Sequence, residues 1–229
     1  FIPALLSGKA VMYKPSEYAT LTGLEIEKLL KEGRVSKGLF QVAIGGKTVG
    51  NALLDLPFQG YFFTGSYQTR QYIYETVAPK MVPCQLELGG KDPLYIAEDV
   101  ADVKEVAAAT ADGAFYNNGQ SCCSVERIYV HEKNYDEYVA AFVEEVKSWK
   151  KGLPTDEVYL GALTRKDQIA ILEKQVSDAQ EKGAKLLTGG QNTSKKGYYF
   201  EPTVLTNVDH TMLVMKEESF GPIIGIMKV

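Results

Sequence analysis

The sequence predicts an α/β fold in which helices cover a mostly parallel, doubly wound β-sheet. Strand-like apolar runs alternate with amphipathic, helix-like segments throughout the 229 residues. Strands separated by a helix-length connection pair in parallel through right-handed crossovers. The length allows one large domain or two small ones. The alternation therefore predicts the fold class, but a fold alone does not identify a ligand.

Residues 1–90 contain predicted strands and helices in strict alternation. Gly33 and Pro79 each follow a predicted helix and are typical of helix ends. This order is typical of a doubly wound nucleotide-binding domain. The strands are expected at 10–13, 39–44, 61–63 and 86–88, and the helices at 24–33, 46–54 and 66–78.

Residues 91–229 continue the alternation. Asp102 with Glu105 predicts the cap of a helix that ends at Phe115, and Thr164 is expected to cap a later helix that stops at Gly183. The last strand stops at the end of the chain and is expected to be an unpaired edge. With no initiating Met, the chain is expected to be an internal piece of a longer protein. Strands are expected at 93–97, 127–131, 185–188, 199–205 and 223–229, an amphipathic helix at 134–149 and an exposed loop at 189–196.

Composition excludes several classes of protein. A net charge of −4 without a basic stripe argues against a nucleic-acid partner. No apolar run approaches the roughly 18 residues of a membrane helix, and no signal peptide is visible. Three cysteines, two of them adjacent, make a poor disulfide framework and favour a reducing compartment such as the cytoplasm. His131 and His210 fit no metal-ligand spacing, so no metal site is expected.

The stretch Phe115-Tyr-Asn-Asn-Gly-Gln-Ser-Cys-Cys-Ser124 joins a predicted helix to a predicted strand. Apolar residues at helical spacing end at Phe115, and Gly119 suits the left-handed residue that terminates helices. Cys122 therefore lies on a loop held at both ends, where rigid scaffolds present reactive groups. Two interpretations stay open from the residues alone: Cys122 is a nucleophile, or it is a small buried core residue like most free cysteines.

Glu87 lies in a second stretch, Val82–Pro93, inside an apolar strand-like run that ends in two glycines. Because Leu86 and Leu88 flank it, its carboxylate is expected to be partly removed from water, which disfavours the charged form. Such a carboxylate is a candidate general base near neutral pH. The alternative is an edge-strand carboxylate that points at water.

Together the two stretches resemble the aldehyde dehydrogenase superfamily. Its Glu-Leu-Gly-Gly-Lys motif carries the general base and its Gly-Gln-x-Cys motif the nucleophile; here these are Glu87–Lys91 and Gly119–Cys122. The interval of 122 − 87 = 35 residues matches the usual separation in that superfamily. The resemblance implies that residues 1–89 are the later part of a Rossmann-like NAD(P)-binding domain and residues 90–229 most of the catalytic domain.

The loop Tyr61-Phe-Phe-Thr-Gly-Ser66 is a candidate pyrophosphate site, because open α/β sheets bind ligands where strands end. Thr64 and Gly65 follow the strand, and Gly65 lets the backbone approach a phosphate. Ser66 opens a helix, whose N-terminus favours anions, although from the residues alone it is only an N-cap. The family resemblance implies that this serine reaches the pyrophosphate. Arg70 departs from many members, which have glycine at that position.

Lys14 and Glu17 follow another strand and resemble the Lys-Pro-x-Glu positions of the family. The resemblance implies that they hold the hydroxyls of the adenosine ribose. A carboxylate that accepts from a 2′-hydroxyl repels a 2′-phosphate, so Glu17 favours NAD, with NADP as a possibility.

The segment Lys216-Glu-Glu-Ser-Phe-Gly-Pro222 resembles the Glu-Glu-x-Phe-Gly-Pro motif of the family. By that resemblance Glu218 holds the nicotinamide ribose, Phe220 packs beside the nicotinamide pocket, and Leu88 is a further cofactor contact. Without the resemblance, a charged loop before a Gly-Pro turn predicts nothing specific.

The resemblance implies oxidation of an aldehyde to a carboxylic acid. Cys122 would form a thiohemiacetal and then a thioester, which water activated by Glu87 hydrolyses. The oxyanion-holding Asn and the C-terminal oligomerisation strand of the family are absent from these 229 residues. The parent is therefore expected to be a homo-oligomer, and this chain is expected to bind NAD weakly and turn over little.

Three alternatives remain open. Members of the superfamily that acylate coenzyme A commonly lack the glutamate that Glu87 matches, so its presence favours an acid product. A Cys/His hydrolase would need His131 or His210 as partner, and neither lies in a supporting motif. The third alternative is an excised domain without catalytic activity.

Overall fold

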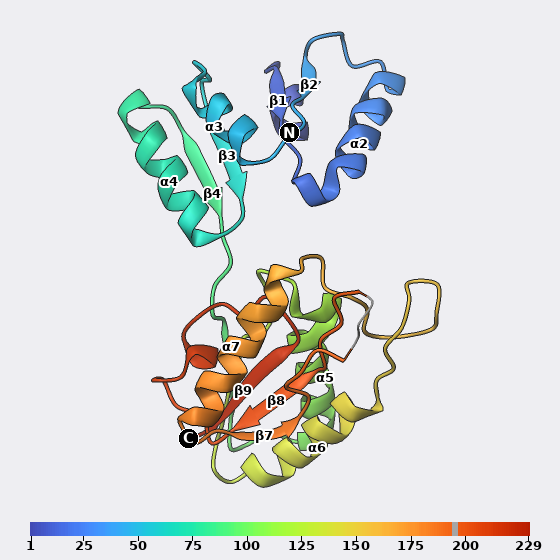
Figure 1. Ribbon diagram of the computed structural model, residues 1–229, viewed down its shortest axis with the longest axis vertical. Helices are drawn as coiled ribbons and strands as arrows, with labels where there is room; N and C mark the ends of the chain where they lie inside the picture. The colour runs from blue at the N-terminus through green and yellow to red at the C-terminus, as the bar shows by residue number, and fades with distance from the viewer. Residues whose placement is uncertain (194–196) are drawn as a thin grey trace. The chain divides into compact units, whose positions relative to one another are not determined.

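The computed structural model describes residues 1–193 and 197–229 and divides into two compact units (Figure 1). Unit 1 comprises Phe1–Glu87 and unit 2 comprises Leu88–Val229. The division falls between Glu87 and Leu88, and the assignment of residues 1–89 and 90–229 to cofactor and catalytic domains stays a prediction. None of the described helices is long and apolar enough to span a membrane.

Unit 1 contains two short parallel strand pairs, where the sequence predicted one sheet. No backbone ladder joins the pairs within residues 1–87, and each contains only three or four residues per strand. Its small core cluster has Leu54, Tyr61, Ile73 and Val77 as buried members. Strands β1 (Val11–Tyr13) and β2 (Phe40–Val42) form one pair, β3 (Tyr61–Thr64) and β4 (Cys84–Glu87) the other, and the helices are α1 (Ile2–Leu6), α2 (Thr20–Glu32), α3 (Lys47–Asp55) and α4 (Tyr67–Val77), with 3₁₀ turns η1 (Glu17–Ala19) and η2 (Ala78–Lys80).

Unit 2 is built on a five-stranded sheet with the order β5-β6-β9-β8-β7. The first four strands in this order are parallel, and β7 is antiparallel to β8. The strands are β5 (Pro93–Ile96), β6 (Arg127–Val130), β7 (Lys185–Thr188), β8 (Thr203–Thr206) and β9 (Ile223–Lys228), and the helices are α5 (Val103–Phe115), α6 (Tyr135–Ser148) and α7 (Asp167–Glu181), with 3₁₀ turns η3 (Tyr116–Gly119) and η4 (Leu213–Met215).

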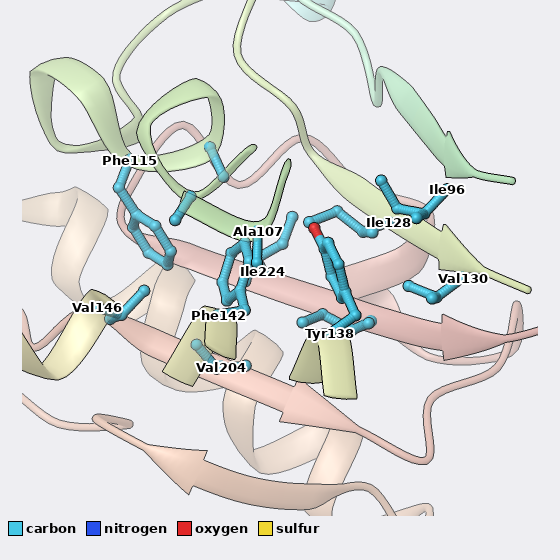
Figure 2. Packing of buried hydrophobic residues seen from close by; sticks show 13 residues of the cluster. Ile96, Ala107, Phe115, Ile128, Val130, Tyr138, Phe142, Val146, Val204 and Ile224 are labelled. Atoms are coloured by element: carbon cyan, nitrogen blue, oxygen red, sulfur yellow. The ribbon is translucent and has the colours of Figure 1, made fainter. Parts of the chain in front are cut away.

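Helices cover both faces of this sheet. Side chains of α5 and α6 pack with one face, where Phe115, Tyr138 and Phe142 are fully buried (Figure 2). Leu172 of α7 packs with Ile223 on the other face. Alternate residues of a strand point to opposite faces, so a central strand must be apolar throughout. This explains the continuous apolar run of β9.

The cap and the end of α5 confirm the sequence prediction. Asp102 accepts hydrogen bonds from the amides of Lys104 and Glu105, both at 3.0 Å. After Phe115 the backbone turns left-handed, with positive φ at three consecutive residues, Asn117, Asn118 and Gly119.

Two expectations about unit 2 are wrong. The last strand is no edge, because β9 lies between β6 and β8 and pairs in parallel with both. Thr164 does not cap α7, which begins at Asp167 after Lys166. The Thr164 amide instead donates to Gln120 Oε1 at 2.9 Å, so this residue supports the loop before Cys122. Part of the loop expected at 189–196 lies outside the described residues.

Candidate active site

Three of the stretches selected from the sequence precede three adjacent parallel strands of unit 2. Gly89–Lys91 precedes β5, Cys122 precedes β6 and Glu218 precedes β9. Because β5, β6 and β9 are parallel neighbours, their amino ends lie at the same end of the sheet. The topology therefore places the three stretches together at that end.

The loop that carries Cys122 is fixed from both sides. A Cβ on Gly119 would lie 2.3 Å from the carbonyl oxygen of Gly221, so only glycine allows this approach of two backbones. Asn118 Oδ1 accepts a hydrogen bond from the Gly161 amide at 3.0 Å. The first contact holds the loop against the segment that leads into β9, and the second holds it against the segment before α7.

Cys122 and Cys123, called here the thiol pair, are both exposed, and their sulfurs lie 3.7 Å apart. Cys122 is therefore no core residue, which excludes the second interpretation of its stretch. The pKa of Cys123 is raised because its thiol hydrogen-bonds to the sulfur of Cys122 and because of the charge there. Cys84 is partly buried, and desolvation raises its pKa. The neighbouring Cys122 sulfur thus opposes ionisation of Cys123.

A buried polar cluster is formed around Glu126, which follows the thiol pair in the chain, and is called here the Glu126 cluster. Glu126 is 5% exposed, and its carboxylate accepts a hydrogen bond from Lys91 Nζ at 2.6 Å. Lys91 Nζ also donates to Ser219 Oγ at 2.8 Å. Desolvation lowers the pKa of Lys91, and the nearby charge of Glu126 opposes that shift. The members are Lys91, Glu126, Gln168, Gln175 and Ser219.

The Glu126 cluster fixes the backbone that presents Glu218 and Phe220. The amides of Ser219 and Phe220 donate to the two oxygens of Glu126 at 3.0 and 3.1 Å. Gln175 Nε2 donates to the carbonyl of Glu218 at 3.2 Å. Phe220 has φ of 45°, a left-handed conformation that costs energy in residues other than glycine. The two bonds to Glu126 hold the turn in which this conformation occurs.

Glu218 contacts the glycines that follow Leu88. A Cβ on Gly89 would lie 1.5 Å from Glu218 Oε1, so a side chain at Gly89 would displace the carboxylate. Burial raises the pKa of Glu218, and the charge of Glu126 adds to the shift. A backbone hydrogen bond from Gly90 acts in the opposite direction. The carboxylate is thus held beside the backbone that joins Leu88 to β5.

In unit 1, Glu87 ends β4 directly opposite Thr64, the last residue of β3. The Gly65 amide donates to the Glu87 carbonyl at 3.1 Å, so the candidate phosphate loop and Glu87 share one strand end. The Glu87 side chain is exposed and accepts from Gln85 Nε2 at 2.7 Å. The expectation of partial desolvation is therefore wrong, since alternate residues of this short strand face away from its core. Glu87 belongs to unit 1 and Cys122 to unit 2.

Ser66 occupies the N-cap position of α4, but its side chain makes no capping hydrogen bond. Its hydroxyl lies 3.1 Å from Thr69 Oγ1. Ser66 therefore leaves the first amides of α4 uncapped, which is the condition for anion binding at a helix N-terminus. Arg70 lies on the first turn with its guanidinium over the ring of Tyr67.

Lys14 and Glu17 lie beside the loop that follows β2. Lys14 Nζ donates to the carbonyls of Pro15 and Gly45 at 2.8 and 2.9 Å. It lies 3.8 Å from Glu17 Oε2, which is exposed. The structure thus brings both predicted ribose contacts together with a glycine loop, Gly45-Gly46, which the sequence analysis did not select.

A family model described as "Aldehyde dehydrogenase family" matches residues 1–229. The chain belongs to the aldehyde dehydrogenase family. It is 37% identical over 233 residues to 3,6-anhydro-alpha-L-galactose dehydrogenase of Vibrio sp. (strain EJY3), covering 99% of this chain and 48% of that protein. It is 38% identical over 229 residues to peroxisomal aminoaldehyde dehydrogenase 1 of Pisum sativum, covering 98% and 45%.

Solved structures show the same fold. The aldehyde dehydrogenase of Mycobacterium tuberculosis, complexed with NAD+, matches with a TM-score of 0.94 and 33% identity, over 99% of this chain and 48% of that one. This family member therefore spans about half the length of the relatives it matches.

Neither histidine of this family member is placed to activate Cys122, as a Cys/His hydrolase would require. His131 follows the carboxyl end of β6, whereas Cys122 precedes its amino end, and His131 Nδ1 accepts from the Lys133 amide at 3.3 Å. His210 Nε2 pairs with the hydroxyl of Tyr129 at 2.8 Å. Both imidazoles thus have partners other than the thiol.

Glu126 and the two glutamines of the cluster were not among the residues predicted from the sequence. Glu126 stands immediately before a strand, and only its burial makes it important. Gln168 and Gln175 were detectable, because they share the helical face of Leu172 at offsets of −4 and +3. Polar residues on an apolar helix face indicate a buried hydrogen-bonded network.

Proposed function

We propose that the parent of this chain oxidises an aldehyde to a carboxylic acid with NAD(P)+ as oxidant, with Cys122 as nucleophile and Glu87 as general base. The observation that carries the proposal is the exposed thiol of Cys122, which lies on a loop held at Gly119 against Gly221, in the segment that leads into β9. A free thiol of pKa about 8.5 is only partly ionised at neutral pH, so the nucleophile needs a partner that favours its thiolate. The sulfur of Cys123 lies 3.7 Å from that of Cys122, within hydrogen-bonding distance, and is the neighbouring group that the structure offers.

The residues that match the family motifs would contact a dinucleotide. Lys14 and Glu17 would hold the adenosine ribose, and the open N-terminus of α4 at Ser66 would receive the pyrophosphate. Glu218 would hold the nicotinamide ribose beside Phe220. When bound, NAD(P)+ supplies the acceptor for the hydride that the substrate loses. Glu17 favours NAD over NADP, since its charge repels a 2′-phosphate.

The thiolate of Cys122 attacks the carbonyl carbon and forms a thiohemiacetal. The backbone amide of Cys122 itself would donate to its oxyanion. Loss of hydride leaves a thioester on Cys122, and Glu87 takes a proton from the water that hydrolyses it. The Glu87 carboxylate is exposed and accepts a hydrogen bond from Gln85 at one oxygen, so water can reach it.

The proposal names the aldehyde group as the reacting group and does not name one aldehyde as the substrate. The relatives named above act by name on an anhydro-galactose and on aminoaldehydes, so the family assigns the aldehyde group and no particular side chain. A cytoplasmic location and a homo-oligomeric parent stay predictions.

The test is Glu87→Gln in the full-length parent. The variant should give a burst of NADH followed by a steady state slower by about 10²–10⁴, because a general base is required mainly for hydrolysis. Glu75→Gln, an exposed carboxylate on α4, serves as the matched control and should behave as wild type.

Two results would contradict the proposal. Loss of the burst in Glu87→Gln, with Cys122 still fully alkylated, would give Glu87 another role. Formation of acyl-coenzyme A when coenzyme A is supplied, with no free acid, would favour the acylating alternative.

A further inference from the structure

The loop before β6 directs two consecutive side chains to the same side. In an extended chain, neighbouring side chains point to opposite faces. Here Ser121 and Ser124 close a tight turn, since the Ser121 carbonyl accepts from the amide and the hydroxyl of Ser124 at 3.3 and 2.9 Å. The Cys123 amide also donates to Ser121 Oγ at 3.2 Å. The turn leaves both thiols exposed, with 3.7 Å between their sulfurs.

We propose that the thiol pair is a reversible oxidative modification site, at which a small hydroperoxide converts Cys122 and Cys123 to a vicinal disulfide. Exposure admits the oxidant, and the short sulfur–sulfur distance supplies the resolving thiol without any change of fold. This inference goes beyond the proposed reaction, because it concerns the protein without cofactor or aldehyde.

The chemistry balances with hydrogen peroxide as the oxidant. The Cys122 thiolate attacks one peroxide oxygen, the O–O bond breaks, and hydroxide leaves a sulfenic acid on Cys122. The Cys123 sulfur then attacks the Cys122 sulfur, so an S–S bond forms, the S–O bond breaks and water leaves. In total two thiols lose two hydrogens and one peroxide becomes two waters.

The pair also explains the order of the two steps. The causes that raise the pKa of Cys123 are mainly the hydrogen bond to Cys122 and the charge on its sulfur. Both weaken once Cys122 is a neutral sulfenic acid, so the resolving thiol ionises more readily after the first step than before it.

The product is expected to be easily reduced. Adjacent Cα atoms lie about 3.8 Å apart, below the usual range of about 4.4–6.8 Å for disulfides. Strained, exposed disulfides have high reduction potentials and are the labile ones. Closure would therefore mask Cys122 temporarily and spare it the irreversible sulfinic and sulfonic acids.

The experiment treats the chain with limited hydrogen peroxide, blocks free thiols with N-ethylmaleimide and maps the peptide that contains Cys122 by mass spectrometry. We expect this peptide to be unlabelled and two hydrogens lighter, and dithiothreitol should restore both labels. Cys84→Ser should behave in the same way, because its thiol takes no part. In Cys123→Ser, Cys122 should progress to sulfinic acid, and dithiothreitol should restore only a minor fraction.

Three outcomes would overturn the inference. These are equal irreversible oxidation in wild type and Cys123→Ser, a disulfide between two chains, and a disulfide to Cys84. Because the readout needs neither cofactor nor turnover, failure here leaves the proposed dehydrogenase reaction untouched, and failure of the Glu87→Gln test leaves this inference untouched.

Discussion

Cys122 and Cys123 are neighbours in the sequence, but their surroundings make them chemically different. Cys122 precedes Cys123 in a turn where the Cys123 thiol hydrogen-bonds to the sulfur of Cys122. The hydrogen bond to Cys122 and the charge on its sulfur raise the pKa of Cys123. Reactivity follows the thiolate, so the two residues should differ in rate although both are exposed.

The first prediction concerns the order of alkylation. Brief treatment with sub-stoichiometric iodoacetamide should label Cys122 first. The pKa of Cys123 is raised by its hydrogen bond to the sulfur of Cys122, and the pKa of the partly buried Cys84 is raised by desolvation. Both thiols are therefore less ionised, and the thiolate is the form that reacts. Fragmentation mass spectrometry separates the adjacent positions. Earlier labelling of Cys123 or Cys84 would refute the assignment of Cys122 as the nucleophile.

The second prediction concerns the pH profile of Cys123. In Cys122→Ser the neighbouring charge is gone, so the pKa of Cys123 should fall and the midpoint of its pH–rate curve should move to lower pH. At about pH 8 its initial alkylation rate should therefore exceed that in wild type. Cys84→Ser should leave the curve in place. An unchanged curve in Cys122→Ser would show that the two thiols are not coupled.

At the scale of elements, the sequence predicted most of the structure that has a periodic signal. The helix 103–115 and its cap at Asp102 are confirmed, because spacing and capping residues are local properties. The edge position expected for the last strand was wrong, because pairing partners of β9 come from residues 127–130 and 203–206. Strand order depends on such long-range contacts, which a pattern within one segment does not contain.

The same reasoning applies to the candidate site. The motifs containing Cys122 and Glu218 were visible because each has a recognisable local sequence. Glu126 was not, since its importance comes from burial and from amides 93 and 94 residues away in the chain. A buried carboxylate that accepts from these two amides and from Lys91 is recognised only in the folded state.

The third prediction concerns the Glu126 cluster. Glu126→Gln should lower the free energy of unfolding of unit 2 by about 3–5 kcal/mol, because the variant breaks a buried ion pair and leaves Lys91 without its carboxylate. Urea unfolding followed by the fluorescence of Trp149, the single tryptophan, measures this unit. Glu201→Gln, whose partner Lys151 is partly exposed, is the matched control and should cost about 0–1 kcal/mol. Equal losses in the two variants would show that burial of the pair adds nothing.

At the scale of the whole chain, the two units differ in how much apolar surface they bury. In unit 1 the buried apolar residues are few, and its strand pairs contain only three or four residues per strand. In unit 2 a five-stranded sheet is packed on both faces, and Ile224 and Ile226 of β9 are fully buried. Hydrophobic burial is the main favourable term in folding, so local stability should follow this difference.

The last prediction is that amide hydrogens of unit 2 exchange more slowly than those of unit 1. The amides of β9 bond within a ladder that has neighbours on both sides, so they should open only when unit 2 unfolds. Strands β3 and β4 pair with each other in a two-stranded sheet, and the core cluster of unit 1 has four buried residues. A smaller local unfolding event therefore exposes their amides to solvent. Hydrogen exchange followed by mass spectrometry should show at least about tenfold slower exchange in β9. Equal protection of β3 and β9 would mean that unit 1 gains its stability from something other than the apolar surface that it buries.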